Sequence, residues 1–316
     1  MTIQSKKIIS VVIPLYNKRE HIVRTIDSVL AQTMLSYEII VVDDGSTDGG
    51  EHLVDRQYGD RVRLVRQLNA GVSCARNRGV QEASGEIIAF LDADDTWEPH
   101  FLAEIAQLVK DFPEAGVLCT AYQLVINGGE YVDPKIRFRK RMKHPGILDD
   151  YFDVGARGDL PFFMSSFCIK RDIFYKLGKF PERVAMGEDQ YLFCRAALHT
   201  PIAYSPSILS FYHLDASNRA CHQIVPTEEC SFSKCVNKYA QSETNKHKRE
   251  MMIRYSSAHL LHIASLNIRM KSYEVAKKIL ADDRCKYQPL RYMWWLGLCL
   301  FGQLTTTYRA AYRCVK

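Results

Sequence analysis

The chain has 316 residues, of which 47% are hydrophobic and 25% are charged, and its formal net charge is +6. This is the composition of an ordinary globular protein, and no apolar run reaches the ~18–20 residues that a membrane-spanning helix needs. The charge is uneven, because residues 230–316 carry 16 Lys and Arg against 5 Asp and Glu. We therefore expect the C-terminal region to meet an anionic partner such as a membrane surface or a polyanion.

The first 125 residues alternate short apolar segments with segments whose apolar residues recur at helical spacing. Strands are predicted at residues 8–15, 38–42, 62–65, 87–91 and 116–126. Helices are predicted to begin at Glu20, after Asp48, at Ser73 and at Glu98. This alternation predicts right-handed βαβ units and an α/β fold with a mostly parallel central sheet flanked by helices.

Aspartates directly follow two of these strands. Asp43 and Asp44 end the strand at 38–42, and Asp92, Asp94 and Asp95 end the strand at 87–91. The carboxyl ends of parallel strands meet at one edge of a sheet, where α/β proteins bind ligands. Crowded carboxylates stay ionised only beside positive charge, which a divalent cation with open positions for phosphate oxygens would supply. The alternative is a solvated turn with a helix cap.

Glycine-rich phosphate loops are absent from the sequence. No G-x-G-x-x-G follows the first strand, and no G-x-x-x-x-G-K-[ST] occurs anywhere. These motifs place backbone N–H groups around phosphates. Without them, the sequence does not predict a dinucleotide-binding site of the Rossmann type or a P-loop. If phosphates bind at this sheet, we expect a metal ion to hold them.

The pattern after residue 126 is less regular. A strand is predicted at 165–169, a helix at 171–177, a helix beginning at Gly187-Glu188-Asp189, and a pair of strands within 202–213. The basic run at 135–143 is interpreted as a solvated loop, and nucleic acid is not expected as a partner. Beyond Pro226 the pattern is helical, which predicts a helical C-terminal region at 226–316.

The ten cysteines include no C-x-x-C pair, and several lie inside apolar runs, as reduced core cysteines do. Residues 1–7 pass directly into a strand, so we expect no signal peptide. Together these features predict a cytoplasmic protein.

Five short motifs occur in one order along residues ~8–215. They are Val12-Ile13-Pro14-Leu15-Tyr16-Asn17, Val41-Val42-Asp43-Asp44-Gly45-Ser46-Thr47-Asp48, Asn69-Ala70-Gly71 with Ala75-Arg76-Asn77, Phe90-Leu91-Asp92-Ala93-Asp94-Asp95 and Gly187-Glu188-Asp189. Their types and order resemble those of the bacterial family-2 glycosyltransferases, which have the GT-A nucleotide-diphospho-sugar transferase fold. The resemblance implies a GT-A catalytic domain at 1–225, composed of a nucleotide-binding half at 1–125 and an acceptor-side half at 126–225.

The resemblance also implies a nucleotide site at the sheet edge. Pro14, Tyr16 and Asn17 would lie beside the nucleotide. Either Asp43 or Asp44 would accept the uracil imide hydrogen if the donor is a UDP-sugar. The sequence leaves the choice between these two aspartates open.

Metal and phosphate roles are implied for the next motif, which resembles the family's D-x-D element. Asp94 would coordinate Mn²⁺ or Mg²⁺ bridging the two phosphates, and Asp92 would contact the ribose, a metal-bound water or the metal. Asp95 would orient the donor sugar or support the metal site, and Arg76 would lie against the diphosphate. His213 resembles a histidine that is a further metal ligand in some members, although a hydrogen-bonded surface histidine is an equal alternative.

Asp189 matches the general base of the family, with Glu188 beside it. An acceptor hydroxyl is a poor nucleophile near neutral pH, so a carboxylate that takes its proton lowers the barrier. The alternative role for Asp189 is a helix N-cap.

The resemblance therefore implies a metal-dependent, inverting hexosyl- or N-acetylhexosaminyltransferase. It would move a sugar from a nucleotide-diphosphate donor to a glycan or lipid-linked saccharide in capsule, O-antigen or exopolysaccharide biosynthesis. The alternative is a catalytically inactive nucleotide-sugar or glycan-binding subunit on the same fold. We also expect residues 226–316 to dock on the cytoplasmic face of the inner membrane through Tyr292, Trp294 and Trp295, unless these aromatic residues pack against the catalytic domain.

Overall fold

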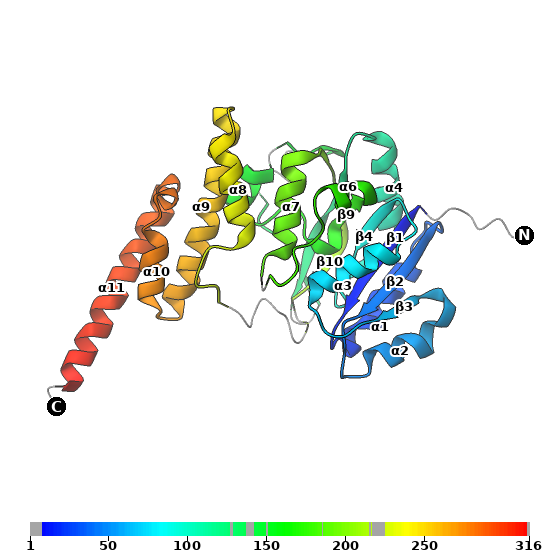
Figure 1. The fold of residues 1–316 in the computed structure, drawn as a ribbon, viewed down its shortest axis with the longest axis horizontal. Coiled ribbons are helices and arrows are strands. Elements are labelled where there is room, and N and C mark those ends of the chain that lie inside the picture. Colours follow the sequence, from blue (N-terminus) through cyan, green and yellow to red (C-terminus); the bar gives the residue numbers. More distant parts are fainter. Residues whose placement is uncertain are drawn as a thin grey trace, which may run out of the picture. The chain divides into compact units, whose positions relative to one another are not determined.

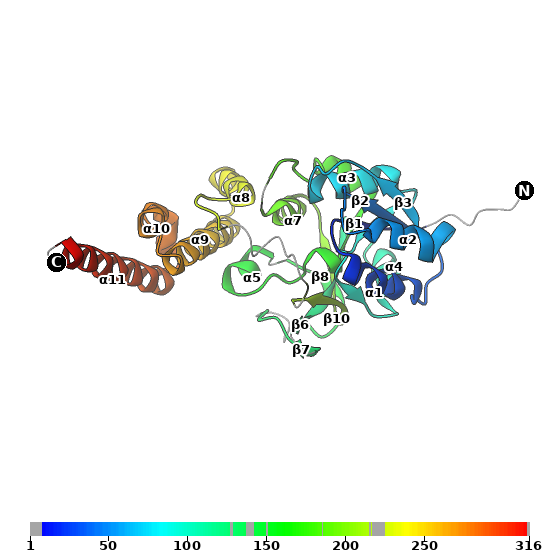
Figure 2. The ribbon, with the colours of Figure 1, turned by 90° about the horizontal axis from the view of Figure 1, so that it is seen from below.

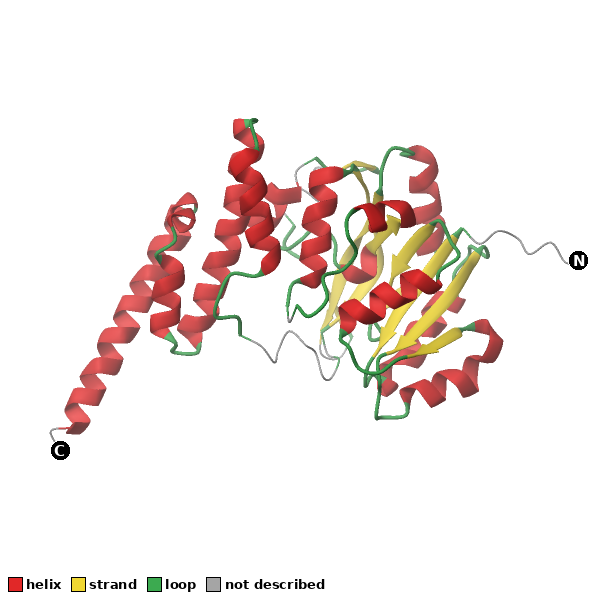
Figure 3. Cartoon of the chain, in the orientation of Figure 1, coloured by secondary structure: helices red, strands yellow, loops and turns green. Residues whose placement is uncertain are grey.

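The computed structural model describes residues 8–126, 129–136, 142–149, 151–184, 186–214, 216 and 225–314. The N-terminal segment 1–7 and residues 137–141 of the basic run lie outside these ranges. The chain divides into two compact units, Met1–Tyr151 with Gly158–Arg219 and Phe152–Arg157 with Ala220–Lys316 (Figure 1). Among the described residues, strands occur in the first unit, and the second is built from helices (Figure 3).

Ten strands of the described chain form a single sheet in the first unit. They are β1 (Ile9–Leu15), β2 (Tyr37–Asp43), β3 (Arg63–Arg66), β4 (Ile87–Phe90), β5 (Thr96–Trp97), β6 (Val117–Ile126), β7 (Glu130–Val132), β8 (Gly146–Ile147), β9 (Phe167–Lys170) and β10 (Ile202–His213). The main path runs β3-β2-β1-β4-β9-β6-β10-β5, with β7 beside β6 and β8 beside β10. The sheet is rich in fully buried β-branched residues, as expected for strands covered on both faces.

Six strands of the main path share one direction. β1 is parallel to β2 and β4, β2 to β3, and β6 to β10. β9 is antiparallel to both β4 and β6, and β5 is antiparallel to β10. The expected α/β class with a mostly parallel central sheet is confirmed, and the reversed strand β9 joins its two parallel parts.

Helices cover both faces of the sheet (Figure 2). On one face, α1 (Arg19–Leu30), α2 (Gly50–Tyr58) and α4 (Phe101–Asp111) share a buried apolar cluster with the odd-numbered residues of β1 and β2. On the other face lies α3 (Val72–Glu82), whose Gly79 approaches β1 so closely that an added Cβ would stand 2.3 Å from Val12 Cγ1. This close approach fixes the position of α3 over the sheet.

Three boundaries differ most from the prediction. The strand predicted at 165–169 begins at Phe167, because Met164–Ser166 form a 3₁₀ turn. Residues 202–213 form the single strand β10 rather than a pair, and its register against β6 shifts between Ser205 and Ile208 and again before Ser210. These irregularities interrupt the alternation of the strand, which is why the sequence suggested two strands. The helix predicted from Glu98 begins at Phe101, because Thr96 and Trp97 pair with β10 first.

Between β8 and β10 the first unit also contains the 3₁₀ turn η2 (Met164–Ser166), α6 (Arg171–Lys176) and α7 (Glu188–His199). A further 3₁₀ turn, η1 (Gly59–Arg61), follows α2. The eight cysteines whose side chains the structure describes are free, and Cys119 and Cys168 are completely buried on neighbouring strands.

The second unit is helical. It contains most of α5 (Tyr151–Arg157), followed by α8 (Ser231–Ser242), α9 (Lys246–Arg269), α10 (Tyr273–Leu280), η4 (Asp283–Tyr287) and α11 (Pro289–Cys314). Apolar residues of α9, α10 and α11 form its core, which includes the buried side chains of Leu261, Ala264 and Cys299. In the part of the chain that the structure describes, no helix combines the length and apolar character needed to cross a membrane.

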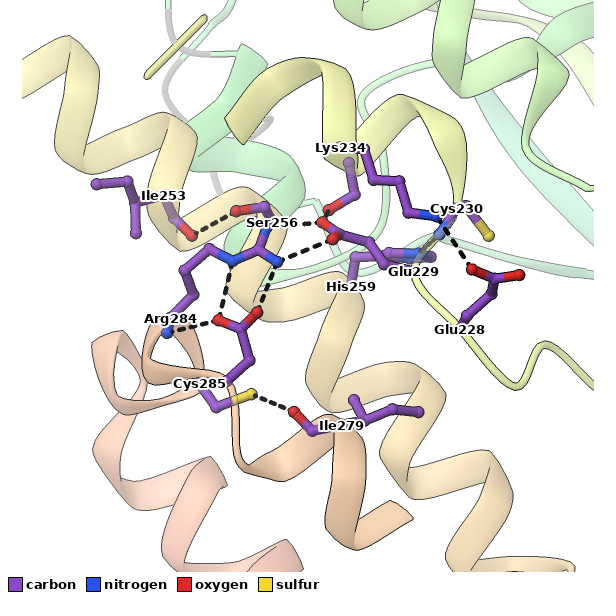
Figure 4. A network of polar contacts seen from close by, with 12 residues as sticks. Glu228, Glu229, Cys230, Lys234, Ile253, Ser256, His259, Ile279, Arg284 and Cys285 are labelled. Atoms are coloured by element: carbon purple, nitrogen blue, oxygen red, sulfur yellow. Dashed lines mark hydrogen bonds and ion pairs between the residues drawn. The ribbon is translucent and has the colours of Figure 1, made fainter. Parts of the chain in front are cut away.

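A polar network ties the start of α8 to η4 (Figure 4). The Arg284 guanidinium donates to both carboxylate oxygens of Glu229, at 2.6 and 2.8 Å, and to the carboxylate of Asp282, at 2.8 and 3.0 Å. On α9, His259 Nε2 accepts a hydrogen bond of 3.2 Å from the backbone N–H of Cys230. Bidentate pairs of this kind are specific in geometry, so the network fixes the register of these elements.

Candidate functional site

The motifs at the ends of β1, β2 and β4 meet at one edge of the sheet because these strands are parallel neighbours. Leu15 pairs with Asp43, and Val12 pairs with Phe90, the last residue of β4. The loops that begin at Tyr16, Asp44 and Leu91 therefore leave the sheet side by side. This arrangement brings together the residues that the sequence predicts for nucleotide and phosphate binding.

The loops after β1 and β2 are joined by Asn17. Its side-chain oxygen accepts a 2.8 Å hydrogen bond from the backbone N–H of Thr47, and its own N–H donates to Ser46 Oγ at 3.1 Å. Asn17 has a positive φ of 51°, a conformation that asparagine adopts more readily than most residues. Neighbouring Tyr16 is 49% exposed, so its ring is available at the edge.

Asp43 and Asp44 are both almost completely buried, but their hydrogen bonds differ. Asp44 accepts from Gln67 Nε2 at 2.7 Å and from the backbone N–H groups of Ala70 and Gly71, both at 2.9 Å. Asp43 accepts one side-chain hydrogen bond, from the Ser46 N–H at 3.2 Å. Asp44 thus holds the loop before α3, which leaves Asp43 the aspartate with more capacity to accept a further hydrogen bond.

Arg76 connects the D-x-D segment to the start of α7. Its Nη2 lies 2.7 Å from Asp92 Oδ1, and its Nη1 lies 3.0 Å from Glu188 Oε1. The Arg76 side chain is only 4% exposed. Partial burial of Asp92 and repulsion from Asp94 raise the pKa of Asp92, and the pairing with Arg76 opposes this rise. The sequence indicated that positive charge must stand among these acids, and a protein side chain supplies part of it.

Asp94 has a different cationic partner. Lys18 Nζ, from the segment between β1 and α1, lies 2.7 Å from Asp94 Oδ2. The backbone of the same turn is held by α1, because Arg24 Nη2 donates to the Asp94 carbonyl at 2.8 Å. Thr25 Oγ1 lies 2.9 Å from both the Ala93 and the Asp95 carbonyl oxygens. The D-x-D turn is therefore fixed by side chains from the first helix.

Asp95 is fully buried beneath this turn. Its carboxylate accepts a 2.5 Å hydrogen bond from Ser165 Oγ and a 3.0 Å hydrogen bond from the backbone N–H of His213. Burial, followed by repulsion from Asp94 and Asp92, raises the pKa of Asp95 well above its usual value. A direct contact between Asp95 and the donor sugar does not fit this burial. The second expected role, support of the site from below, does fit it.

Metal ligation is compatible with two residues of the expected set. The described residues include no group of three or more His, Cys, Asp or Glu side chains that could hold a metal ion. His213 is buried, and its Nε2 lies 3.0 Å from Thr96 Oγ1. Asp92 and Asp94 are partly exposed at the edge, and Mg²⁺ is often held by one or two carboxylates together with phosphate and water oxygens. The donor set therefore suits such an ion without His213.

The candidate base Asp189 stands in the first turn of α7. Gly187, with a positive φ of 79°, is the N-cap of this helix. The N-cap alternative for Asp189 is therefore wrong, and Asp189 Oδ1 accepts from the adjacent Gln190 N–H at 2.6 Å. Burial, followed by repulsion from Glu188, raises the pKa of Asp189 to about 7. A carboxylate with this pKa is suited to take a proton near neutral pH.

The helix-cap alternative for the acids after β4 is likewise wrong. The N-cap of α4 is His100, which makes no side-chain cap hydrogen bond, and none of the three aspartates caps that helix. The side chains at this edge that the sequence did not indicate are Lys18, Thr25 and Ser165, which contact Asp94, the D-x-D turn and Asp95. The pairing of Glu188 with Arg76 was also not predicted. Lys18 directly follows the Tyr16-Asn17 motif and could have been noted, whereas nothing in the sequence marks Ser165.

Comparison with known proteins bears on this arrangement. The family model described as glycosyl transferase family 2 matches residues 10–178. An uncharacterized glycosyltransferase of Nostoc sp. is 42% identical over 113 residues, which are 35% of each chain. TuaG of Bacillus subtilis, whose name refers to teichuronic acid biosynthesis, is 34% identical over 146 residues, covering 45% of this chain and 58% of that protein. The chain thus spans only part of these relatives.

The structure is also similar to a crystal structure of Staphylococcus aureus TarS residues 1–349 in complex with UDP-GlcNAc. The TM-score is 0.72 at 17% sequence identity, and the match covers 96% of this chain and 92% of the other. At this identity the likeness concerns the fold, and it confirms the expected GT-A architecture.

Proposed function

Since the chain belongs to glycosyltransferase family 2, we propose that it transfers a sugar from a nucleotide-diphosphate donor with inversion at the anomeric carbon. The observation that carries this proposal is the Arg76 bridge between Asp92 and Glu188, which holds the candidate base segment beside the D-x-D turn. The turn proposed to bind the donor phosphates and the helix start that carries the proposed proton acceptor are thereby joined through one buried arginine.

Asp189 is the proposed general base. Its pKa of about 7 means that a large fraction of the carboxylate is ionised near neutral pH while it remains basic enough to accept a proton. It would take the proton of the acceptor hydroxyl as the oxygen attacks the anomeric carbon from the face opposite the leaving diphosphate. The C–O bond to the acceptor forms as the bond to the diphosphate breaks, so no covalent enzyme intermediate is required.

Asp43 is the proposed contact to the base of the nucleotide, with Pro14 and Tyr16 beside the nucleoside. Asp43 is favoured over Asp44 because three donors already engage the Asp44 carboxylate. A UDP-sugar is the proposed donor class, because the Asp43 carboxylate can accept a hydrogen bond from the imide N–H of uracil. The UDP-GlcNAc in the TarS structure also supports this class. In this proposal Asn17 shapes the pocket through its contacts with Ser46 and Thr47.

The proposed cofactor is Mn²⁺ or Mg²⁺, held by Asp92 and Asp94. When bound, such an ion neutralises the charge that develops on the diphosphate leaving group. Lys18 and Arg76 keep the two aspartates paired when the nucleotide is not bound. Arg76 is thus proposed to position Asp92 and Glu188, instead of lying primarily against the diphosphate.

The proposed acceptor is a glycan or lipid-linked saccharide, and the proposed pathway is the synthesis of a bacterial surface polysaccharide. The relationship to TuaG supports this pathway. We place the protein in the cytoplasm with peripheral contact to the inner membrane. Residues 1–225 would be the catalytic domain, with residues 1–125 binding the nucleotide and residues 126–225 on the acceptor side.

The test is release of UDP by the purified full-length chain from a panel of UDP-glucose, UDP-galactose and their N-acetylated analogues. Activity should require Mn²⁺ or Mg²⁺, stop with a chelator, and fall by ~10³-fold or more in Asp94→Ala if charge stabilisation dominates. Asp55→Ala, which removes an acid that is 64% exposed on α2, is the matched control and should retain activity. Full activity of Asp94→Ala would refute the assignment.

A binding subunit without catalysis is the competing outcome. It would be indicated if the unmodified chain bound a UDP-sugar but released UDP from none of the donors in the panel. Asp189→Asn would then change nothing measurable, whereas the proposed transferase should lose turnover and retain donor binding in this variant.

A further inference from the structure

Helix α11 is apolar on two opposite faces. On the inner face, Tyr292, Trp295, Leu296 and Cys299 pack in the core that α11 shares with α9 and α10. The opposite face is exposed to solvent and is also apolar. We call it the outer face of α11, and its exposed large residues are Leu290, Met293, Trp294, Leu298, Leu300, Phe301 and Leu304.

The outer face is continuous along the helix. Leu290, Trp294, Phe301 and Leu304 recur at spacings of three to seven residues, which places them on one side of an α-helix. They are 88%, 64%, 68% and 70% exposed. At 1.5 Å per residue the face extends over ~20 Å. No Asp, Glu, Lys or Arg occurs between Arg291 and Arg309, so no charge interrupts the face from Met293 to Leu304.

The structure corrects the aromatic residues expected to reach a membrane. Of Tyr292, Trp294 and Trp295, only Trp294 lies on the outer face. Tyr292 and Trp295 pack within the second unit itself, and the Arg269 guanidinium lies 5.9 Å from the Trp295 ring. Tyr292 and Trp295 therefore pack against α9 and α10 of their own unit, and not against the catalytic domain as the alternative drawn from the sequence proposed.

Charge decides what can cover this face. The exposed basic residues on and near α10 and α11 are Lys271, Lys277, Lys278, Lys286 and Arg291, and the exposed acids there are Glu274 and Asp283. Further exposed Lys and Arg residues lie on α8 and α9. Residues 230–316 carry 16 Lys and Arg against 5 Asp and Glu. A second copy on the outer face would bring two strongly basic units together, which is electrostatically unfavourable. An anionic lipid surface instead attracts these residues, by about 1 kcal/mol for each Lys or Arg near it.

We propose that the outer face of α11 is a docking surface for an anionic membrane, in which the helix lies parallel to the lipid surface. Leu290, Trp294, Phe301 and Leu304 enter the boundary between headgroups and acyl chains, while the neighbouring lysines and arginines meet the headgroups. This docking proposal rests on one part of the proposed function, the peripheral contact with the inner membrane. It adds the side chains that make that contact.

Vesicle flotation of the full-length chain tests the proposal, and it requires no sugar transfer. The wild type should float with vesicles of phosphatidylcholine containing about 30% phosphatidylglycerol, bind at least about tenfold less to pure phosphatidylcholine, and be released by salt. Leu290→Ser/Trp294→Ser/Phe301→Ser should lose at least about tenfold in binding. Leu35→Ser is the matched control, because Leu35 is also 88% exposed but lies in the first unit, and it should bind as the wild type does.

Three results would overturn the proposal. One is the absence of flotation, and another is equal flotation of the wild type and the triple variant. The third is a wild-type dimer in solution that the triple variant converts to a monomer, which would show that a second copy covers the face. A thermal melt should show that the triple variant remains folded, since the replaced side chains are exposed. If UDP-sugar turnover is absent but flotation behaves as expected, only the proposed transfer reaction fails.

Discussion

Arg76 and Glu188 form a 3.0 Å ion pair between residues that are 112 positions apart in the sequence. The same guanidinium pairs with Asp92 at 2.7 Å. Because Arg76 is almost completely buried, its charge is poorly screened by water. One side chain thereby connects the segment proposed to bind the donor phosphates with the segment proposed to carry the base.

Arg76→Met should destabilise the first unit by roughly 3–5 kcal/mol, since it leaves the Asp92 and Glu188 carboxylates without their buried partner. It should also raise the pKa of Asp189 above about 7, because Arg76 lowers that pKa in the wild type. Urea unfolding and the pH profile of kcat measure the two effects.

Arg78→Met on the same helix is the control. Its side chain is 50% exposed and pairs with Glu82, so it should cost less than about 1 kcal/mol and leave the profile unchanged. Equal behaviour of the two variants would contradict the bridge.

The raised pKa of Asp189 predicts opposite effects on activity and stability. As a base, Asp189 must be ionised, so kcat should rise with pH through about 7. Its folded pKa lies above the unfolded value of 3.8, so the folded state loses stability as pH rises from about 4 to above 7. Asp189→Asn should therefore lower kcat by ~10²–10⁴-fold. The same variant should unfold at higher urea concentration than the wild type at pH 8 and at a similar concentration near pH 4.

Much of this site could be predicted because strand periodicity and short motifs are local. The acids after β2 and β4 had to meet at one edge once the sheet was parallel. The sequence could not predict the contact of Arg76 with Glu188 or that of Asp95 with Ser165. Each contact joins side chains that are far apart in the sequence and meet only in the folded chain. For α11, adjacent Trp294 and Trp295 point to different faces, and a helix that is apolar on both sides does not reveal which face is inward.

The burial of Asp95 distinguishes a supporting role from contact with the donor. Asp95→Ala leaves the Ser165 hydroxyl and the His213 N–H without their acceptor, which should cost roughly 2–4 kcal/mol. Asp95→Asn keeps an oxygen for the His213 N–H and an amide that can donate to Ser165, so it should cost much less. Urea unfolding and the KM for the donor should be measured for both variants. A large rise in KM in Asp95→Asn at wild-type stability would show that Asp95 contacts the donor instead.

His259 makes the second unit sensitive to acid. Burial lowers its pKa to about 4, and its Nε2 accepts from the Cys230 N–H. Because the folded pKa lies below the unfolded value of 6.5, its stabilising effect is complete above pH 6.5 and is lost as pH falls towards 4. The loss should amount to about 3 kcal/mol once the pH has fallen to 4 or below, at 1.36 kcal/mol for each pKa unit. Urea unfolding followed by tryptophan fluorescence reports on this unit, since two of the three tryptophans, Trp294 and Trp295, lie in it.

The variant His259→Gln retains an acceptor for the Cys230 N–H and cannot be protonated, so its stability should decline less between pH 6.5 and 4. An identical decline in both proteins would assign the acid sensitivity to other groups.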